Sequence, residues 1–143
     1  MRKNLRPDQL DDLLERPIVA VLATRRPDDE LLLSPVWHEW QDGGFTVASS
    51  WDDVKVRHLR RDPRASIVVH ESSPPYRGLE VRGVATLSKA GASETALRIA
   101  IRYLGEEGGR AYAYEEPDDV LIRVEPGVLR AWDFVDEYPD PER

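Results

Sequence analysis

The 143-residue sequence contains no cysteine, and this absence excludes several classes of protein. There is nothing from which to build a disulfide framework or a thiolate metal site, and nothing points to an oxidising compartment. Long hydrophobic runs are missing as well. The longest is Ile18–Ala23, which is too short for a membrane span or for the core of a signal peptide. We therefore expect a cytoplasmic protein that does not interact with membranes.

The sequence also lacks the short motifs that mark common enzyme classes. It has no G-x-S-x-G elbow, no Walker phosphate-binding loop and no G-x-G-x-x-G dinucleotide fingerprint. Its three histidines, His38, His58 and His70, show neither HxH nor HExxH spacing, so we expect no metal site. No pair of carboxylates stands out as a general acid and base. Catalytic residues therefore stay unassigned at this stage.

The formal net charge of −7 opposes a role in nucleic-acid binding, because duplex binding depends on neutralising phosphates with basic side chains. The charge is unevenly spread. Residues 55–64 hold five basic side chains against Asp62 alone, a local charge of +4, so that the other residues sum to −11. A compact basic segment on an acidic protein favours a small anionic ligand over a long polyanion.

A chain of this length has the size of one domain, which we place at 1–143. It can bury roughly two-thirds of its unfolded surface, which is enough to fold without disulfides. Hydrophobic periodicity predicts about seven strands, at 18–23, 31–40, 45–49, 65–70, 79–88, 120–125 and 128–134. Within 31–40, alternation puts Val36, His38 and Trp40 on one face and Trp37 and Glu39 on the other.

Two or three helices are predicted between these strands. One opens at Pro7 and ends at Pro17, one covers 51–61, and one carries an apolar stripe over 97–104 that stops at Gly105. Ser50 and Asp53 resemble a capping box at the start of the second helix. The polar segment 106–119 has room for a helical turn, and the acidic tail after 134 is expected to be loose or to lie on the surface. Mostly hairpin-linked strands with helices between them favour a mostly β, α+β fold, an antiparallel barrel with peripheral helices, over a βαβ fold.

The strongest candidate for a binding site is the segment 47–57. A strand ends in Ser49 and Ser50, a helix begins directly behind them, and Lys55 and Arg57 follow within two turns. Free N–H groups at a helix start, two hydroxyls and two cations form a phosphate cradle. The alternative is a capped helix whose basic face contacts only water, and the acidic residues at 52 and 53 support it.

A second candidate is Ser34-Pro35-Val36-Trp37. A small hydroxyl, a residue without an N–H and an aromatic side chain in mid-strand can form a wall for a planar ring. The alternative is a proline on an edge strand beside a core tryptophan.

Several strings of residues together resemble one family. They are Val19–Thr24, Leu33–Trp37, Lys55–Arg64 and Leu79–Gly83, supported by Pro74–Tyr76 and Arg102–Gly105. The most specific is the pattern Lys-x-Arg-x-Leu-Arg-Arg-Asp-Pro-Arg after a strand that ends in hydroxyls. The sequence resembles the pyridoxamine 5′-phosphate oxidase-like split-barrel family, and most of all its branch of small F-420 (deazaflavin)-dependent oxidoreductases. The likeness runs from about residue 10 to residue 134.

This resemblance implies a homodimeric split barrel with a cofactor at each end of the shared interface. The cofactor is expected to be F-420, with FMN as the alternative, and to carry hydride to or from a small substrate. A non-catalytic flavin-binding protein is the third possibility. The phosphodiester and oligoglutamate tail of F-420 fit the additional basic residues at 60 and 61. An acidic end to the chain, in place of the longer basic end of true pyridoxamine phosphate oxidases, argues against oxidation of pyridoxamine phosphate.

The resemblance also assigns roles to residues. It implies that Ser34–Trp37 lie along the ring system, and that the phosphate and ribityl end is held by Ser49, Ser50, Lys55 and Arg57. His58 stands where many relatives have asparagine and is a further candidate contact. Further candidate cofactor contacts, which the partner subunit can supply, are Tyr76, Arg77 and Arg102. Trp132 is expected near the subunit interface.

Overall fold

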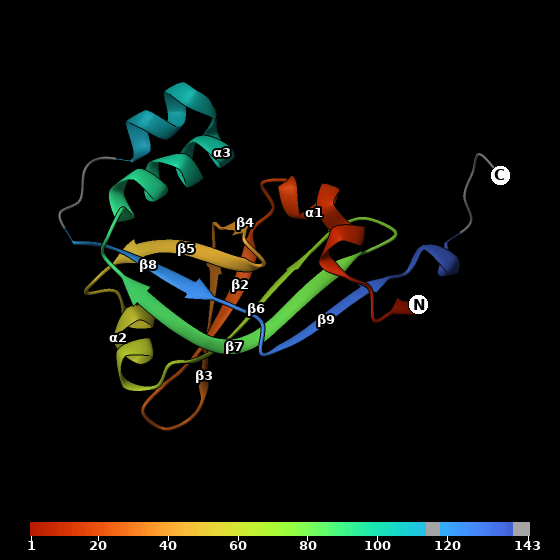
Figure 1. The fold of residues 1–143 in the computed structure, drawn as a ribbon, viewed down its shortest axis with the longest axis horizontal. Coiled ribbons are helices and arrows are strands. Elements are labelled where there is room, and N and C mark those ends of the chain that lie inside the picture. The colour runs from red at the N-terminus through yellow and green to blue at the C-terminus, as the bar shows by residue number, and fades with distance from the viewer. Residues whose placement is uncertain (114–117, 139–143) are drawn as a thin grey trace.

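The computed structural model describes residues 1–113 and 118–138, and within them a curled antiparallel sheet forms a half-barrel with helices around it (Figure 1). The sequence predictions for 114–117 and 139–143 lie outside the described residues. The strands are β1 Arg2–Lys3, β2 Ala20–Arg25, β3 Leu31–Val36, β4 Glu39–Gln41, β5 Gly44–Ser50, β6 Arg64–His70, β7 Gly78–Ser88, β8 Asp119–Val124 and β9 Val128–Asp133. The helices are α1 Asp11–Glu15, preceded by a 3-10 turn Pro7–Leu10, then α2 Val54–Arg61, α3 Ala92–Tyr112 and a 3-10 turn Val135–Glu137.

The strands pair in the order β3-β2-β6-β7-β8-β5-β4, and β9 also pairs with β7. The first part of the eleven-residue β7 pairs with β9 and its last part, from Ala85, pairs with β8. Gly83 lies at this change of partner, and a Cβ there would come within 2.3 Å of the Glu125 carbonyl oxygen. Only glycine therefore permits the close approach that lets one long strand serve both halves of the barrel.

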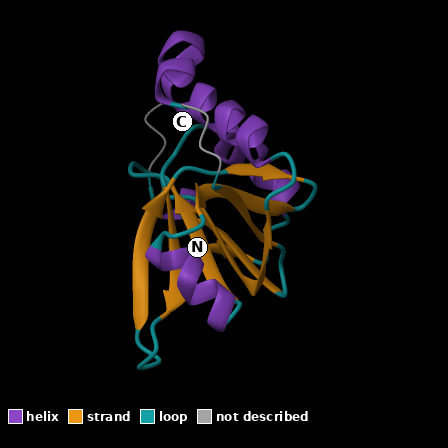
Figure 2. Ribbon diagram, turned by 90° about the vertical axis from the view of Figure 1, so that its left-hand side faces the viewer, coloured by secondary structure: helices purple, strands orange, loops and turns teal. Residues whose placement is uncertain are grey.

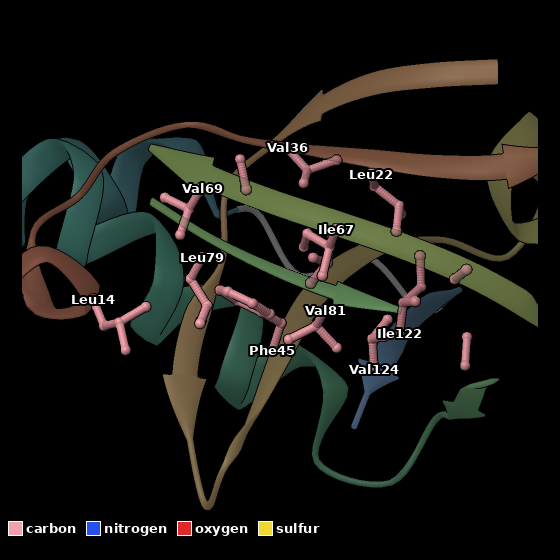
Figure 3. Close-up of a cluster of buried hydrophobic side chains, with 14 of the residues drawn as sticks. Leu14, Leu22, Val36, Phe45, Ile67, Val69, Leu79, Val81, Ile122 and Val124 are labelled. Carbon is pink, nitrogen blue, oxygen red and sulfur yellow. The ribbon is translucent and has the colours of Figure 1, made fainter. Parts of the chain in front are cut away.

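The core fills the inside of the curled sheet. Figure 3 shows part of this core, with side chains from α1 and from strands along the whole length of the chain, and these include Leu22, Phe45, Ile67, Leu79 and Ile122, all fully buried. Burial alternates along β2, β6 and β8, as expected for strands with one face inward. Figure 2 shows the helices lying outside this body of strands.

Strands and helices occur where the sequence predicts them, although some of their bounds differ. The predicted fold class, a mostly β, α+β antiparallel barrel with peripheral helices, is confirmed. The seven predicted strands are present, and the short β1 and β4 bring the number to nine among the described residues. The predicted capping box is wrong. Helix α2 begins at Val54 behind Asp53, and neither Ser50 nor Asp53 makes a side-chain cap hydrogen bond, because the Asp53 carboxylate is bound by Ser49 and Lys55 instead.

The predicted strand 31–40 is interrupted after Val36, and this is a second correction. The backbone N–H of His38 donates to the Tyr103 hydroxyl at 3.2 Å, and its carbonyl accepts from the Arg102 guanidinium. Side chains of α3 thus satisfy the backbone groups that a sheet ladder would otherwise bind. His38 is fully buried, and Glu39, which the alternation placed on the opposite face, is also buried, with 8% of its surface exposed.

Helix α3 is two helical arms joined at Gly105. The predicted stop at this residue is confirmed as a break, with φ 80° and ψ 173°, but the chain resumes a helical course up to Tyr112. That backbone conformation is open essentially to glycine alone. The first arm lies over β5 and β8, as Figure 1 shows.

The ends of the described chain lie side by side (Figure 1). Strand β1 pairs with β9, Arg2 makes a two-pronged ion pair with Asp136, and the Met1 ammonium group pairs with Glu137. The first residues of the acidic tail therefore lie on the surface, as expected. Within residues 1–113 and 118–138, no helix has both the length and the apolar character that a membrane crossing requires.

Candidate cofactor site

A cavity of about 610 Å³ opens between the end of β3, the end of β5, the start of α2 and the first arm of α3. Its volume lies in the range typical of sites for small molecules and cofactors. The residues that line it are Pro35, Val36, Trp37, Ala48, Ser49, Ser50, Asp53, Lys55, Ser93, Glu94, Ala96, Leu97, Ile99, Ala100, Tyr112, Ala113 and Asp119. Both sites that the sequence suggested separately thus contribute to one cavity.

The polar wall of the cavity centres on Asp53. Its Oδ2 accepts hydrogen bonds from the Ser49 hydroxyl at 3.0 Å and from the Lys55 ammonium at 2.7 Å. Burial raises the pKa of the Asp53 carboxyl, but the hydrogen bonds from Lys55 and Ser49 outweigh it, and the net pKa lies below the ordinary value. Ser50 lines the same wall. A carboxylate, two hydroxyls and an ammonium group therefore lie together at the start of helix α2.

The second wall is aromatic and belongs to the predicted ring site. The rings of Trp37 and Tyr103 stack with centroids 5.0 Å apart and planes 10° from parallel. Tyr112, on the second arm of α3, packs against Trp37 at 4.9 Å. The Tyr103 hydroxyl donates to the Ile18 carbonyl at 2.7 Å. Trp37 is thereby fixed between the two arms of the helix, with Pro35 and Val36 beside it in the lining.

Sequence reasoning missed the wall that α3 supplies. Leu97 and Ala100 lie on the apolar stripe that the sequence revealed, but a stripe shows which face of a helix is buried and not which part of the sheet it covers. Asp53 was interpreted as part of a capping box and as an argument against a binding site. The remaining residues that were not foreseen are Ser93, Glu94, Ala96, Ile99, Tyr112, Ala113 and Asp119.

Three predicted contacts from the same segments lie outside the lining. Ser34 is half-buried next to Pro35, and Arg57 is exposed on α2. His58 is buried, and its Nδ1 lies 3.0 Å from the Thr24 hydroxyl on β2. Burial, followed by the charges of nearby arginines, lowers its pKa. Within one chain this imidazole therefore serves the packing of α2 on the sheet.

The three predicted contacts from later in the chain also lie away from the cavity of their own subunit. Tyr76 is exposed in the loop between β6 and β7 and packs against Tyr138. Arg77 binds Asp12 at 2.9 Å and the buried Glu71 at 3.0 Å, and these hydrogen bonds raise its pKa. Their assignment to a partner subunit's site stays a prediction.

Arg102 connects three parts of the chain through backbone carbonyls. Its guanidinium donates to the carbonyls of Leu14 and Arg16, both at 2.7 Å, and to that of His38. It thereby ties α3 to the end of α1 and to the interruption between β3 and β4. Within its own chain this side chain holds the wall of the cavity and does not line it.

The family of the chain follows from its match to a family model. The model for pyridoxamine 5′-phosphate oxidase matches residues 7–133. The chain belongs to the pyridoxamine 5′-phosphate oxidase family. The match spans every wall of the cavity, from Pro35 to Asp119.

Solved structures share the fold of this chain. The chain is similar to a conserved hypothetical protein from Mycobacterium tuberculosis, at 22% identity and a TM-score of 0.79, covering 95% of this chain and 90% of that one. It is similar to an F420 reductase at 29% identity and a TM-score of 0.69, covering 83% of this chain and 94% of that one. It is also similar to an FAD-binding protein from Mesorhizobium loti at 17% identity and a TM-score of 0.64, covering 91% and 93%. A comparison with curated protein sequences gives no match.

The residues of the cavity fit the flavin type of cofactor that the pyridoxamine 5′-phosphate oxidase family implies. Lys55 and Ser49 already hold a carboxylate oxygen at hydrogen-bond distance, so the same donors suit a phosphate oxygen. Trp37, Val36 and Pro35 present an apolar and aromatic surface to the same space. Among the described residues, no group of three or more histidine and acidic side chains is placed to hold a metal ion.

Proposed function

We propose that this protein binds F-420 or FMN in the 610 Å³ cavity and serves as an oxidoreductase for a small substrate. One observation carries the proposal: the cavity joins an anion-binding wall, around Lys55, to an aromatic wall, around Trp37, in a single space. A flavin or deazaflavin has this same division between a charged phosphate end and a planar ring. A bound cofactor of this type supplies the hydride chemistry.

The residues of the chain then bind and orient. Lys55, with Ser49 and Ser50, receives the phosphate end at the start of α2, where the dipole of the helix also favours an anion. The segment 35–37 lies along the ring, and the stacking of Trp37 on Tyr103 keeps that surface rigid. The small apolar side chains of α3, Ala96 and Ala100 among them, leave room for a substrate and keep water away.

F-420 is the preferred cofactor and FMN the alternative. The F420 reductase has the higher identity of the flavin-related structures described above, 29%, and it supports this order of preference. The FAD-binding protein keeps the flavin alternative open at a lower identity. A non-catalytic flavin carrier shares the same binding features, and substrate turnover is the measurement that separates it from an enzyme.

We also propose that the protein works as a homodimer whose interface borders the cavity. Alternate residues of β3 point outward, with Leu31 54% and Leu33 62% exposed, and Val19 nearby is 48% exposed. Pro35 continues this outer row and also lines the cavity. Apolar side chains gathered on one edge of a sheet favour a protein partner. A second subunit on this face reaches the open side of the cofactor site.

The experiment that tests the function is a titration of the purified protein with F-420 and with FMN in parallel, followed by fluorescence. We expect saturable binding at micromolar concentration or below, tighter for F-420. Binding of FMN alone would replace the preferred cofactor by the alternative. Absence of binding to both would overturn the proposed function.

A further inference from the structure

The Asp53 carboxylate holds the donors that the proposed phosphate site needs. A single oxygen, Oδ2, accepts both the Ser49 hydroxyl at 3.0 Å and the Lys55 ammonium at 2.7 Å. The Lys55 side chain is only 16% exposed and that of Asp53 39%, so the pair is partly shielded from water. This oxygen therefore stands where the anionic oxygen of a ligand would bind the same two side chains.

The side chains that line the cavity carry more negative than positive charge. Lys55 is the single cationic side chain among the described residues that line it, and the lining also contains Asp53, Glu94 and Asp119. A ligand phosphate that reaches Lys55 must take the place of the Asp53 carboxylate and then sit beside it. Repulsion between like charges at such short range grows with the charge of the phosphate.

Resting on the function proposed above, we propose that Asp53 determines the specificity of the site by charge. It acts as a built-in counter-ion of Lys55 that a ligand must displace, and it disfavours a doubly charged phosphate monoester relative to a singly charged phosphodiester. FMN carries the monoester and F-420 the diester, so the contribution of the phosphate to binding is less unfavourable for F-420 beside Asp53. Asp53 positions Lys55 and Ser49 and takes no part in bond-making.

The test compares Asp53→Asn with the native protein, using FMN and riboflavin as probes at pH 8. Asparagine keeps the shape of the side chain and an oxygen acceptor for Lys55, but it removes the charge. Riboflavin differs from FMN by the phosphate alone, so it reports every effect other than that on the phosphate. We expect Asp53→Asn to lower the dissociation constant of FMN about fivefold or more and to change that of riboflavin less than twofold. The gain for F-420, whose phosphate has one charge, is expected to be smaller than that for FMN.

The matched control is Asp52→Asn, which removes an exposed carboxylate one residue away that does not line the cavity. It is expected to leave both dissociation constants within twofold of the native values. Unchanged or weaker FMN binding by Asp53→Asn would overturn the inference, as would an equal gain for riboflavin or an equal gain in Asp52→Asn. If neither the native protein nor Asp53→Asn binds any of the three probes, the proposed function itself falls and the inference falls with it.

Discussion

At the scale of single residues, His38 is the most deeply buried of the three histidines. It is fully buried and packs edge-on against Phe45, and among the described residues its ring nitrogens make no hydrogen bond of good geometry, although the backbone of Ile18 lies close enough to raise its pKa a little. Burial, followed by the charge of Arg102, lowers its pKa from 6.5 to about 4. The folded protein therefore keeps this imidazole neutral at a pH at which the unfolded chain protonates it.

This difference predicts how stability depends on pH. Below pH 6.5 the unfolded state binds a proton at His38 that the folded state does not, so the free energy of unfolding falls as the pH drops from 6.5 to about 4. The contribution of His38 over this range is about 3 kcal/mol. His38→Leu is expected to flatten the decline, measured by urea unfolding at several pH values. His58, whose pKa is also lowered, accounts for part of the decline that remains; an unchanged slope in His38→Leu would contradict the prediction.

Lys55 gives a second prediction at this scale. Lys55→Ala removes the cation of the cavity and is expected to weaken F-420 and FMN binding about tenfold or more, as expected for loss of a charge-assisted hydrogen bond. Isothermal titration provides the measurement. The control is Arg64→Ala, since Arg64 pairs with Asp62 outside the cavity. Equal weakening in both variants would mean that the general charge of the protein, and not this site, attracts the ligand.

At the scale of elements, the break in α3 at Gly105 decides how the aromatic wall is built. The first arm carries Tyr103 and the second carries Tyr112, and both rings contact Trp37. Gly105→Ala is expected to lower the free energy of unfolding by about 1–3 kcal/mol, because a residue with a Cβ is strained at this φ and ψ although no atom lies in its way. Urea denaturation measures the change.

The matched control for this prediction is Gly108→Ala, on the regular part of the second arm. Its Cβ would meet only the Leu104 Cβ, at 3.2 Å, a close contact that a movement of a few tenths of an ångström relieves, and the backbone at Gly108 does not have the positive φ of Gly105. The change in stability is expected to be smaller than for Gly105→Ala. Equal losses in the two variants would show that the break in α3 carries no special strain.

The elements also show how much the sequence could predict. Strand positions followed from alternation, and the meeting of Ser49 with Lys55 followed from a strand that ends directly before a helix. The interruption after Val36 could not be foreseen, because it depends on the side chain of Tyr103, 65 positions beyond His38. The sequence also allowed Arg102 to be interpreted as a ligand contact, because its true partners lie far away along the chain. Its partners are backbone carbonyls, and no residue type in the sequence marks those.

At the scale of the whole molecule, the outer row of β3 predicts association. Leu33→Glu places a charge in the centre of this row and is expected to convert a dimer to a monomer, measured by light scattering after size-exclusion chromatography. Stability of the subunit should change little, since the side chain is 62% exposed. Leu104→Glu, exposed on α3, is the control and is expected to remain dimeric. A native protein that runs as a monomer would contradict the proposed interface.

The pairing of β5 with β8 has a consequence for the synthesis of the protein. Ser50 pairs with Asp119 and Phe45 with Val124, so the second partner of β5 is made long after β5 itself. At usual translation rates, the 69 residues from Ser50 to Asp119 take roughly 3 to 14 seconds. During that interval β5 has only the short β4 as a neighbour and leaves one edge open. The cavity, whose lining includes Asp119 at the start of β8, is therefore complete only after β8 has been made, and a cofactor can assist only the last stage of folding.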